Sequence, residues 1–194
     1  MFLAEKELEI PSVQINTRER EHYGEAYQAV NPHNVVPALE LDNGACIGES
    51  VAICRYIEET HPEPPLMGRD AQEKAVVEMW NRRAELEGYL AAADAVRNSM
   101  PLFENRGLPG VPEPVPQIPA LAERGKLALD RFFDKLDKQL AENQFVAGEA
   151  ISIADITAFV AIEFAKWDDN DIPDSCANVS RWYAEMSARP SASA

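Results

Sequence analysis

Residues 35–50 read VVPALELDNGACIGES, and this stretch decides the fold of the first part of the chain. Apolar runs lie on both sides of Asp42-Asn43-Gly44, and Asn-Gly between two such runs is the strongest short signal for a β-hairpin. A helix is predicted from Ser50 to about Glu59, because Ser is among the commonest residues at a helix start. The stretch therefore predicts a hairpin that leads directly into a helix.

The residues before this hairpin have an apolar pattern that changes period several times. Phe2 to Lys6 is predicted to be the end of a helix, since no capping residue precedes it. From Ile10 the sequence alternates, with Val13 and Ile15 on one face, and this alternation predicts a strand. A polar helical stretch is predicted around residues 19–30, so the first 60 residues read as an α/β domain.

The hexapeptide HPEPPL at residues 61–66 ends the helix that precedes it, because proline lacks a backbone donor and restricts the residue before it. We expect a linker over residues 61–69. Asp70 and Glu73 then have the spacing of a capping box, which marks the start of a new helix. Strand signals do not return after this point, so residues 70–194 are predicted to be all-helical.

The helix predicted from Ala71 to about Asn98 has two apolar stripes, which is one more than a single packing face needs. The first stripe is Val76, Trp80, Ala84 and Ala91, and the second is Met79, Leu86, Leu90 and Ala93. The second stripe indicates a further partner surface, such as a contact between subunits.

Three further helices are predicted. Six prolines between Pro101 and Pro119 indicate a stiff loop, after which an amphipathic helix starts near Pro119. Residues 153–165 are apolar on nearly every side, which indicates a buried helix, and Ser152 with Asp155 forms its capping box. A last amphipathic helix contains Trp182 and ends before Pro190.

Composition excludes several functions. The 194 residues carry 18 Lys and Arg against 33 Asp and Glu, and a net charge of -15 repels phosphate backbones and anionic lipids. We therefore expect no nucleic acid and no membrane partner.

Cys46, Cys54 and Cys176 have no paired spacing, which favours a reducing cytoplasm, with Cys46 and Cys54 as small buried apolar residues. The three histidines are too scattered for a metal site and are expected at the surface.

Three segments together resemble the cytosolic glutathione S-transferase family of bacterial type, and they lie at residues 31–39, 43–53 and 145–155. The resemblance implies a thioredoxin-like domain at residues 1–60, a linker at 61–69 and an all-helical domain at 70–194. In the family, a first strand and a Ser, Tyr or Cys that bonds the glutathione sulfur precede the helix that ends near Lys6. The amino-terminal domain therefore reads as incomplete, and we expect the natural protein to begin roughly 15 to 20 residues upstream.

The resemblance also implies a binding site for glutathione. Pro37 is a cis proline in the family, and the backbone of Val36 before it pairs with the cysteinyl part of glutathione like an added strand. Ser50 starts a helix whose unsatisfied amides suit the γ-glutamyl carboxylate, and Glu49 faces the neighbouring ammonium group. These four residues are expected to hold most of the tripeptide.

At the glycine end of glutathione, the resemblance implies a contact from Asn34, with His33 beside it. Many relatives carry Lys before the Val-Pro pair, where this chain has Val35. No catalytic residue is assigned, since residues 1–10 contain no donor for the sulfur.

The function implied is transfer of glutathione to a small hydrophobic electrophile, with glutathione as co-substrate and no metal. Tyr89, Met100, Phe103 and Trp167 either line a hydrophobic pocket or pack in the core. A cytoplasmic homodimer with a role in detoxification is expected. Two alternatives are a scaffold of the same fold that binds ligands without catalysis and a glutathione-dependent disulfide reductase.

Overall fold

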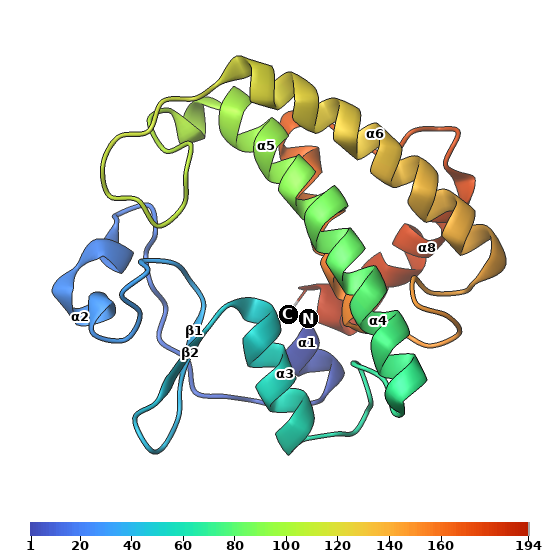
Figure 1. Ribbon diagram of the computed structural model, residues 1–194, viewed down its shortest axis with the longest axis horizontal. Coiled ribbons are helices and arrows are strands. Elements are labelled where there is room, and N and C mark those ends of the chain that lie inside the picture. The colour runs from blue at the N-terminus through green and yellow to red at the C-terminus, as the bar shows by residue number, and fades with distance from the viewer. Residues whose placement is uncertain (194) are drawn as a thin grey trace.

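The structure is a computed structural model that describes residues 1–193 (Figure 1). Its first part comprises α1 (Phe2–Glu5), η1 (Glu21–Tyr23), α2 (Glu25–Gln28), β1 (Ala38–Glu40), β2 (Cys46–Gly48) and α3 (Ser50–Thr60). Its second part comprises α4 (Ala71–Arg83), η2 (Ala84–Tyr89), α5 (Leu90–Ser99), η3 (Pro101–Phe103), α6 (Pro119–Glu142), α7 (Ile153–Ala165), η4 (Lys166–Asp168), α8 (Ala177–Ser187) and η5 (Pro190–Ser193). An α/β part is thus followed by an all-helical part, as the sequence predicts.

The predicted hairpin is confirmed. β1 and β2 are antiparallel, and Leu39 faces Ile47 across the ladder. The turn closes at Gly44, whose backbone N–H donates to the carbonyl of Leu41 at 2.8 Å and whose φ of 81° suits glycine. α3 begins within two residues of the end of β2, so the hairpin positions the start of this helix.

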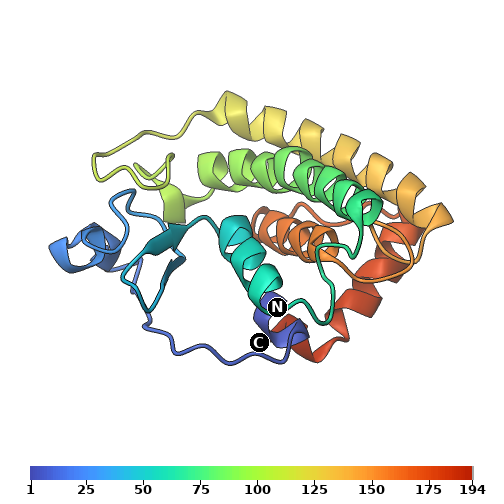
Figure 2. The same cartoon turned by 60° about the horizontal axis from the view of Figure 1, so that its bottom comes forward.

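The strand predicted from Ile10 is wrong. This segment is an irregular coil that runs from α1 toward η1 (Figure 2), and Val13 is 86% exposed. Within residues 1–193 β1 pairs only with β2, and no strand lies beside residues 10–16. A strand needs a neighbour for its backbone groups, so alternation alone does not produce one. The helical stretch predicted at 19–30 is also shorter, because η1 and α2 are separated at Gly24.

The helix predicted from Ala71 to Asn98 is continuous but contains a π-helical turn. α4, η2 and α5 follow one another without a break (Figure 1), and η2 is the π-helical segment. The Asp70 carboxylate caps α4 by accepting the N–H groups of Gln72 and Glu73, both at 2.9 Å. The reciprocal half of the predicted capping box differs, because Glu73 accepts the backbone N–H of Arg69 at 3.0 Å and forms an ion pair with its guanidinium.

The two predicted stripes lie in different environments. Ala84 and Ala91 of the first stripe are buried in the main core, which is formed by η2, α5, α6, α7 and α8. Leu86 and Leu90 of the second stripe are 51% and 52% exposed. The second stripe is therefore an apolar surface of the isolated chain.

α5 and α6 lie side by side (Figure 1), and a glycine sets their separation. A Cβ atom added at Gly125 of α6 would lie 2.6 Å from the backbone nitrogen of Ala95 and 2.7 Å from the carbonyl oxygen of Ala91. The two helix backbones therefore approach more closely here than any larger residue permits.

The start of α7 is fixed by the buried carboxylate of Asp155. This group accepts the backbone N–H of Ser152 at 2.9 Å and its hydroxyl at 3.0 Å, which confirms the predicted capping box. It also accepts the N–H of Val146 at 2.8 Å and the indole N–H of Trp182 at 2.9 Å. One side chain thus joins the loop before α7, the helix itself and α8.

Charged side chains fasten α1 to the rest of the molecule. The ammonium group of Lys6 is fully buried and lies 2.8 Å from the carboxylate of Glu58 in α3. The Glu5 carboxylate accepts two hydrogen bonds of 2.7 Å from Arg189, close to the carboxyl end of the described chain. The first residues of the chain and the last described residues therefore lie next to each other (Figure 2).

The predictions that Cys46 is buried and that His22 lies at the surface are wrong. Cys46 is exposed at the end of β2 nearest the turn, and His22 is buried. Cys176 is buried. Cys54 is partly buried, and this burial raises the pKa of its thiol to about 11. Among residues 1–193, every helix is too short or too polar to span a bilayer.

Candidate functional site

The register of the hairpin brings the predicted glutathione-binding residues to one end of the sheet. Ala38 faces Gly48 in the ladder, so the residues just outside this pair are Pro37 and Glu49. Val36 and Ser50 continue on either side. These four residues form two pairs that are separated in the sequence. The hairpin brings both pairs together at its open end.

The segment before β1 is held by side chains of the preceding helical region. The hydroxyl of Tyr27 and the amide of Asn31 both donate to the carbonyl oxygen of Val35, at 2.6 and 2.8 Å. The Val36–Pro37 peptide bond is cis, as the resemblance implies. Val36 is 46% exposed, and its own backbone groups form no hydrogen bond within residues 1–193. An unpaired backbone is therefore presented at the edge of the hairpin.

Glu49 occupies the cap position of α3 in an unusual conformation. Its φ of 64° is in the left-handed region, which residues other than glycine rarely adopt, and its side chain is exposed. Among the described residues no side chain caps this helix start. Helix amides without a cap carry partial positive charge, so an exogenous carboxylate is favoured there.

The predicted glycine-end residues are placed differently. Asn34, with a φ of 56°, turns its amide toward the loop that follows η3 and donates to the carbonyl of Gly110 at 3.5 Å. Its side-chain oxygen is buried without a donor. His33 is exposed, and its backbone N–H donates to the side chain of Asn31 at 3.1 Å. Asn34 thus links the two parts of the molecule.

The aromatic residues singled out in the sequence form a surface cluster and not a core. Phe164 of α7 lies at its centre, with ring centroids 5.6 Å from Tyr89, 6.4 Å from Phe103 and 5.4 Å from Trp167. Tyr89 and Trp167 are 38% and 56% exposed. Phe164 was not singled out in the sequence, because its position in an apolar helix resembles that of its buried neighbours. We call these four residues the aromatic cluster.

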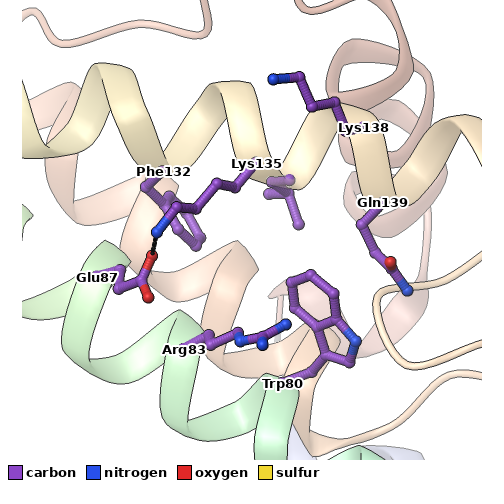
Figure 3. A pocket seen from close by; sticks show the side chains of 8 residues that line it. Trp80, Arg83, Glu87, Phe132, Lys135, Lys138 and Gln139 are labelled. Carbon is purple, nitrogen blue, oxygen red and sulfur yellow. Dashed lines mark hydrogen bonds and ion pairs between the residues drawn. The ribbon is translucent and has the colours of Figure 1, made fainter.

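A separate pocket of about 400 Å³ lies between α4, η2 and α6 (Figure 3). Trp80, Phe132 and Leu136 are its apolar lining, and the guanidinium of Arg83 lies over the Trp80 ring at 4.7 Å. Lys135 at its edge pairs with Glu87 at 2.5 Å. None of the predicted glutathione-binding residues lines this pocket. Among residues 1–193, no three His, Cys, Asp or Glu side chains are grouped to hold a metal ion.

Comparison with known proteins identifies the family. The sequence matches the family model described as glutathione S-transferase, N-terminal domain, over residues 1–65 and the one described as glutathione S-transferase, C-terminal domain, over residues 108–190. It is 33% identical to glutathione S-transferase 2 of Saccharomyces cerevisiae over 194 residues. This alignment covers 97% of this chain and 79% of the relative. The chain belongs to the glutathione S-transferase family.

Solved structures agree with this assignment. A glutathione S-transferase domain-containing protein of Marinobacter aquaeolei superposes with a TM-score of 0.88 at 34% identity, covering 98% of this chain and 91% of that protein. Gtt2 of Saccharomyces cerevisiae also gives 0.88, at 32% identity, with 98% and 89% covered. The fold is thus the family's thioredoxin-like domain with a small sheet, followed by its helical domain.

Proposed function

We propose that this protein transfers glutathione to hydrophobic electrophiles. The observation that carries the proposal is the hairpin register, which sets the unpaired backbone of Val36 beside the uncapped start of α3. A short peptide pairs with such a backbone as an added strand, and its carboxylate suits the helix amides. A free backbone edge and a helix start that accepts an anion are two of the features that bind a tripeptide with an α-carboxylate.

Each residue of the site has a role in this proposal. Val36 pairs with the cysteinyl residue of glutathione, and Pro37 orients that backbone. Ser50 binds the γ-glutamyl carboxylate through its hydroxyl and amide, and Glu49 faces the ammonium group. Asn34 contacts the glycine end. We assign no side chain to activation of the glutathione thiol, whose pKa of about 8.5 must fall for the thiolate to be populated at neutral pH.

The aromatic cluster is the proposed contact surface for the electrophile. Its rings are partly exposed, and it belongs to the helical part of the molecule near the loop that contacts Asn34. Partly exposed aromatic rings offer apolar contacts, flat or edge-on, to a planar substrate. This supports an aromatic electrophile as the second substrate.

Calorimetric titration with reduced glutathione tests the site. The variant Glu49→Ala with Ser50→Ala is expected to weaken binding by on the order of 2 to 4 kcal/mol, because charge-assisted hydrogen bonds are removed. Glu59→Ala, an exposed glutamate on the same helix, is the matched control. Equal affinity of the folded double variant and the control would exclude this site. Turnover of chlorodinitrobenzene against turnover of a small disulfide then tests the reaction.

We also propose a homodimer, in the cytoplasm and with a role in detoxification, built from domains at residues 1–60 and 70–194. The exposed second stripe, with Met79, Leu86 and Leu90, supports a symmetric contact between copies of the chain. Light scattering should then give twice the 21.5 kDa of one chain, and Leu86→Glu should restore the single-chain mass. A single-chain mass for the unaltered protein contradicts the proposal.

A further inference from the structure

Two cationic side chains stand apart from the others. Of the 18 lysines and arginines, ten form ion pairs with carboxylates. Of the remaining eight, six are exposed, and only Arg97 and Arg106 are partly buried within residues 1–193. In a chain with an excess of acidic residues, two half-buried guanidinium groups without a carboxylate are a departure from the general pattern.

Arg97 lies beside the aromatic cluster. Its guanidinium is positioned over the Phe103 ring, 5.0 Å from the centroid. Burial lowers the pKa of Arg97, and the positive charge of Arg106 acts in the same direction, while the nearby hydroxyls of Tyr89 and Tyr23 oppose it. The groups that surround this guanidinium are thus aromatic rings, phenols and a second cation.

Arg106 extends this cationic region toward the first domain. Its guanidinium donates to the carbonyl of Thr17 at 3.1 Å, across the boundary between the two domains. Burial lowers the pKa of His22, with smaller contributions from the charges of Arg106 and Arg20. The neutral form of His22 is therefore favoured, and within residues 1–193 its Nδ1 atom is buried without a partner.

The loop that carries Arg106 is fixed in place. Its carbonyl oxygens accept hydrogen bonds from three residues of the first domain: Arg20 at 2.5 Å, Tyr23 at 3.0 Å and Asn34 at 3.5 Å. Within the loop, the N–H of Val115 donates to the carbonyl of Asn105 at 3.0 Å. Arg106 is therefore carried by a loop anchored to the first domain, while Arg97 is carried by α5 and lies over the Phe103 ring.

Two neighbouring positive charges that are partly removed from water repel each other, and an anion between them relieves this repulsion. Guanidinium groups bind carboxylates through paired, directional hydrogen bonds. A small inorganic anion would leave the adjoining aromatic cluster unused. An aromatic anion would use both features, because its ring would contact the cluster while its charge meets the arginines.

We propose that Arg97 and Arg106 bind the carboxylate of an aromatic electrophile whose ring lies on Tyr89, Phe103, Phe164 and Trp167. The inference rests on the proposed transferase function, and it specifies the class of the second substrate as aromatic acids.

A matched pair of substrates tests this assignment: chlorodinitrobenzoate and its methyl ester. In both reactions the glutathione sulfur forms a bond to the ring carbon, chloride leaves with its electron pair and the thiol proton passes to water. The two substrates differ in the charge of one group. Each enzymatic rate is divided by the uncatalysed rate, so that the difference in intrinsic reactivity cancels.

Arg97→Gln is expected to lower the preference for the acid over the ester by about tenfold or more, as loss of a charge-assisted bond predicts. Arg106→Gln is expected to change it in the same direction. Arg131→Gln is the matched control, because Arg131 is exposed and forms no ion pair within residues 1–193, and its replacement changes the net charge equally. An unaltered preference in both folded variants overturns the proposal.

Calorimetry with dinitrobenzoate, which has no leaving group, separates this inference from the proposed reaction. If the protein has no transferase activity but binds dinitrobenzoate more weakly in Arg97→Gln than in Arg131→Gln, the anion site stands and the reaction fails. If Arg97→Gln weakens glutathione binding and leaves dinitrobenzoate binding intact, the arginines serve the tripeptide and the inference is wrong.

Discussion

Replacing Asp155 by alanine removes the acceptor of four buried hydrogen bonds. The donors are two backbone N–H groups, one hydroxyl and one indole N–H, at 2.8 to 3.0 Å. Asp155, Val146 and Trp182 are each 0% exposed. The donors in this region therefore have no bulk water to replace the lost carboxylate.

The expected loss follows from the fate of each donor. A buried donor without an acceptor destabilises the folded state by about 1 to 3 kcal/mol. The Ser152 hydroxyl can rotate to another acceptor, which leaves three donors fixed by the backbone or by the Trp182 ring. We therefore expect a decrease in the free energy of unfolding of roughly 3 to 9 kcal/mol, a large part of the 5 to 15 kcal/mol typical of a whole domain.

Urea denaturation followed by far-UV circular dichroism measures this effect. Ser152→Ala should lose only about 1 kcal/mol, because its backbone N–H still donates to Asp155. Asp134→Ala, an exposed aspartate on α6, is the control and should leave the midpoint unchanged. The reasoning is refuted if Asp155→Ala unfolds with the same slope and within about 1 kcal/mol of the unaltered protein. If Asp155→Ala shows no cooperative transition, the loss in the free energy of unfolding equals or exceeds the stability of the unaltered domain.

Three further predictions concern packing, thiol reactivity and acid stability. Gly125→Ala should lower the free energy of unfolding by about 1 to 3 kcal/mol, because its Cβ meets the backbone of α5; an unchanged urea midpoint would show that the two helices separate freely. In thiol labelling, exposed Cys46 should react first, while Cys54, with a pKa of about 11 and few thiolates at neutral pH, should react slowly. Cys46→Ser should abolish the fast phase, and persistence of that phase contradicts the assignment. The hydrogen bond from Arg189 lowers the pKa of Glu5, so this carboxylate stabilises the protein above its ordinary pKa near 4.5 and loses that effect as the pH falls further. The stability difference between the unaltered protein and Glu5→Gln should therefore shrink below pH 4.5, and a constant difference would contradict this.

Elements whose determinants are local in sequence were predictable. The Asn43-Gly44 turn, the Asp70 cap and the pair Ser152 and Asp155 each act within a few residues, and the structure contains all three. The segment from Ile10 to Asn16 was not, because strand formation depends on a neighbour elsewhere in the chain. The alternation predicts an apolar face, but within residues 1–193 no other element packs on that face as a neighbouring strand.

The candidate site divides in the same way. Val36 and Pro37 directly precede the hairpin and Glu49 and Ser50 directly follow it, so the turn signal and the resemblance together bring them to one end. The arginine pair has no such signal, because its members sit on a helix and a loop whose relation is set by contacts with residues 17–34. Partial burial without a carboxylate partner is visible only in three dimensions.

The π-helical turn from Ala84 to Tyr89 precedes Arg97 in one continuous helix. A residue added to or removed from an α-helix rotates everything after it by about 100°. The π-helical turn absorbs one extra residue within itself, so deletion of one residue there would restore regular α-helical geometry while Arg97 and the buried alanines of α5 keep their directions. A one-residue deletion should therefore be tolerated in this turn, whereas the same change within the regular helix between Leu90 and Arg97 would rotate Arg97 away from Phe103.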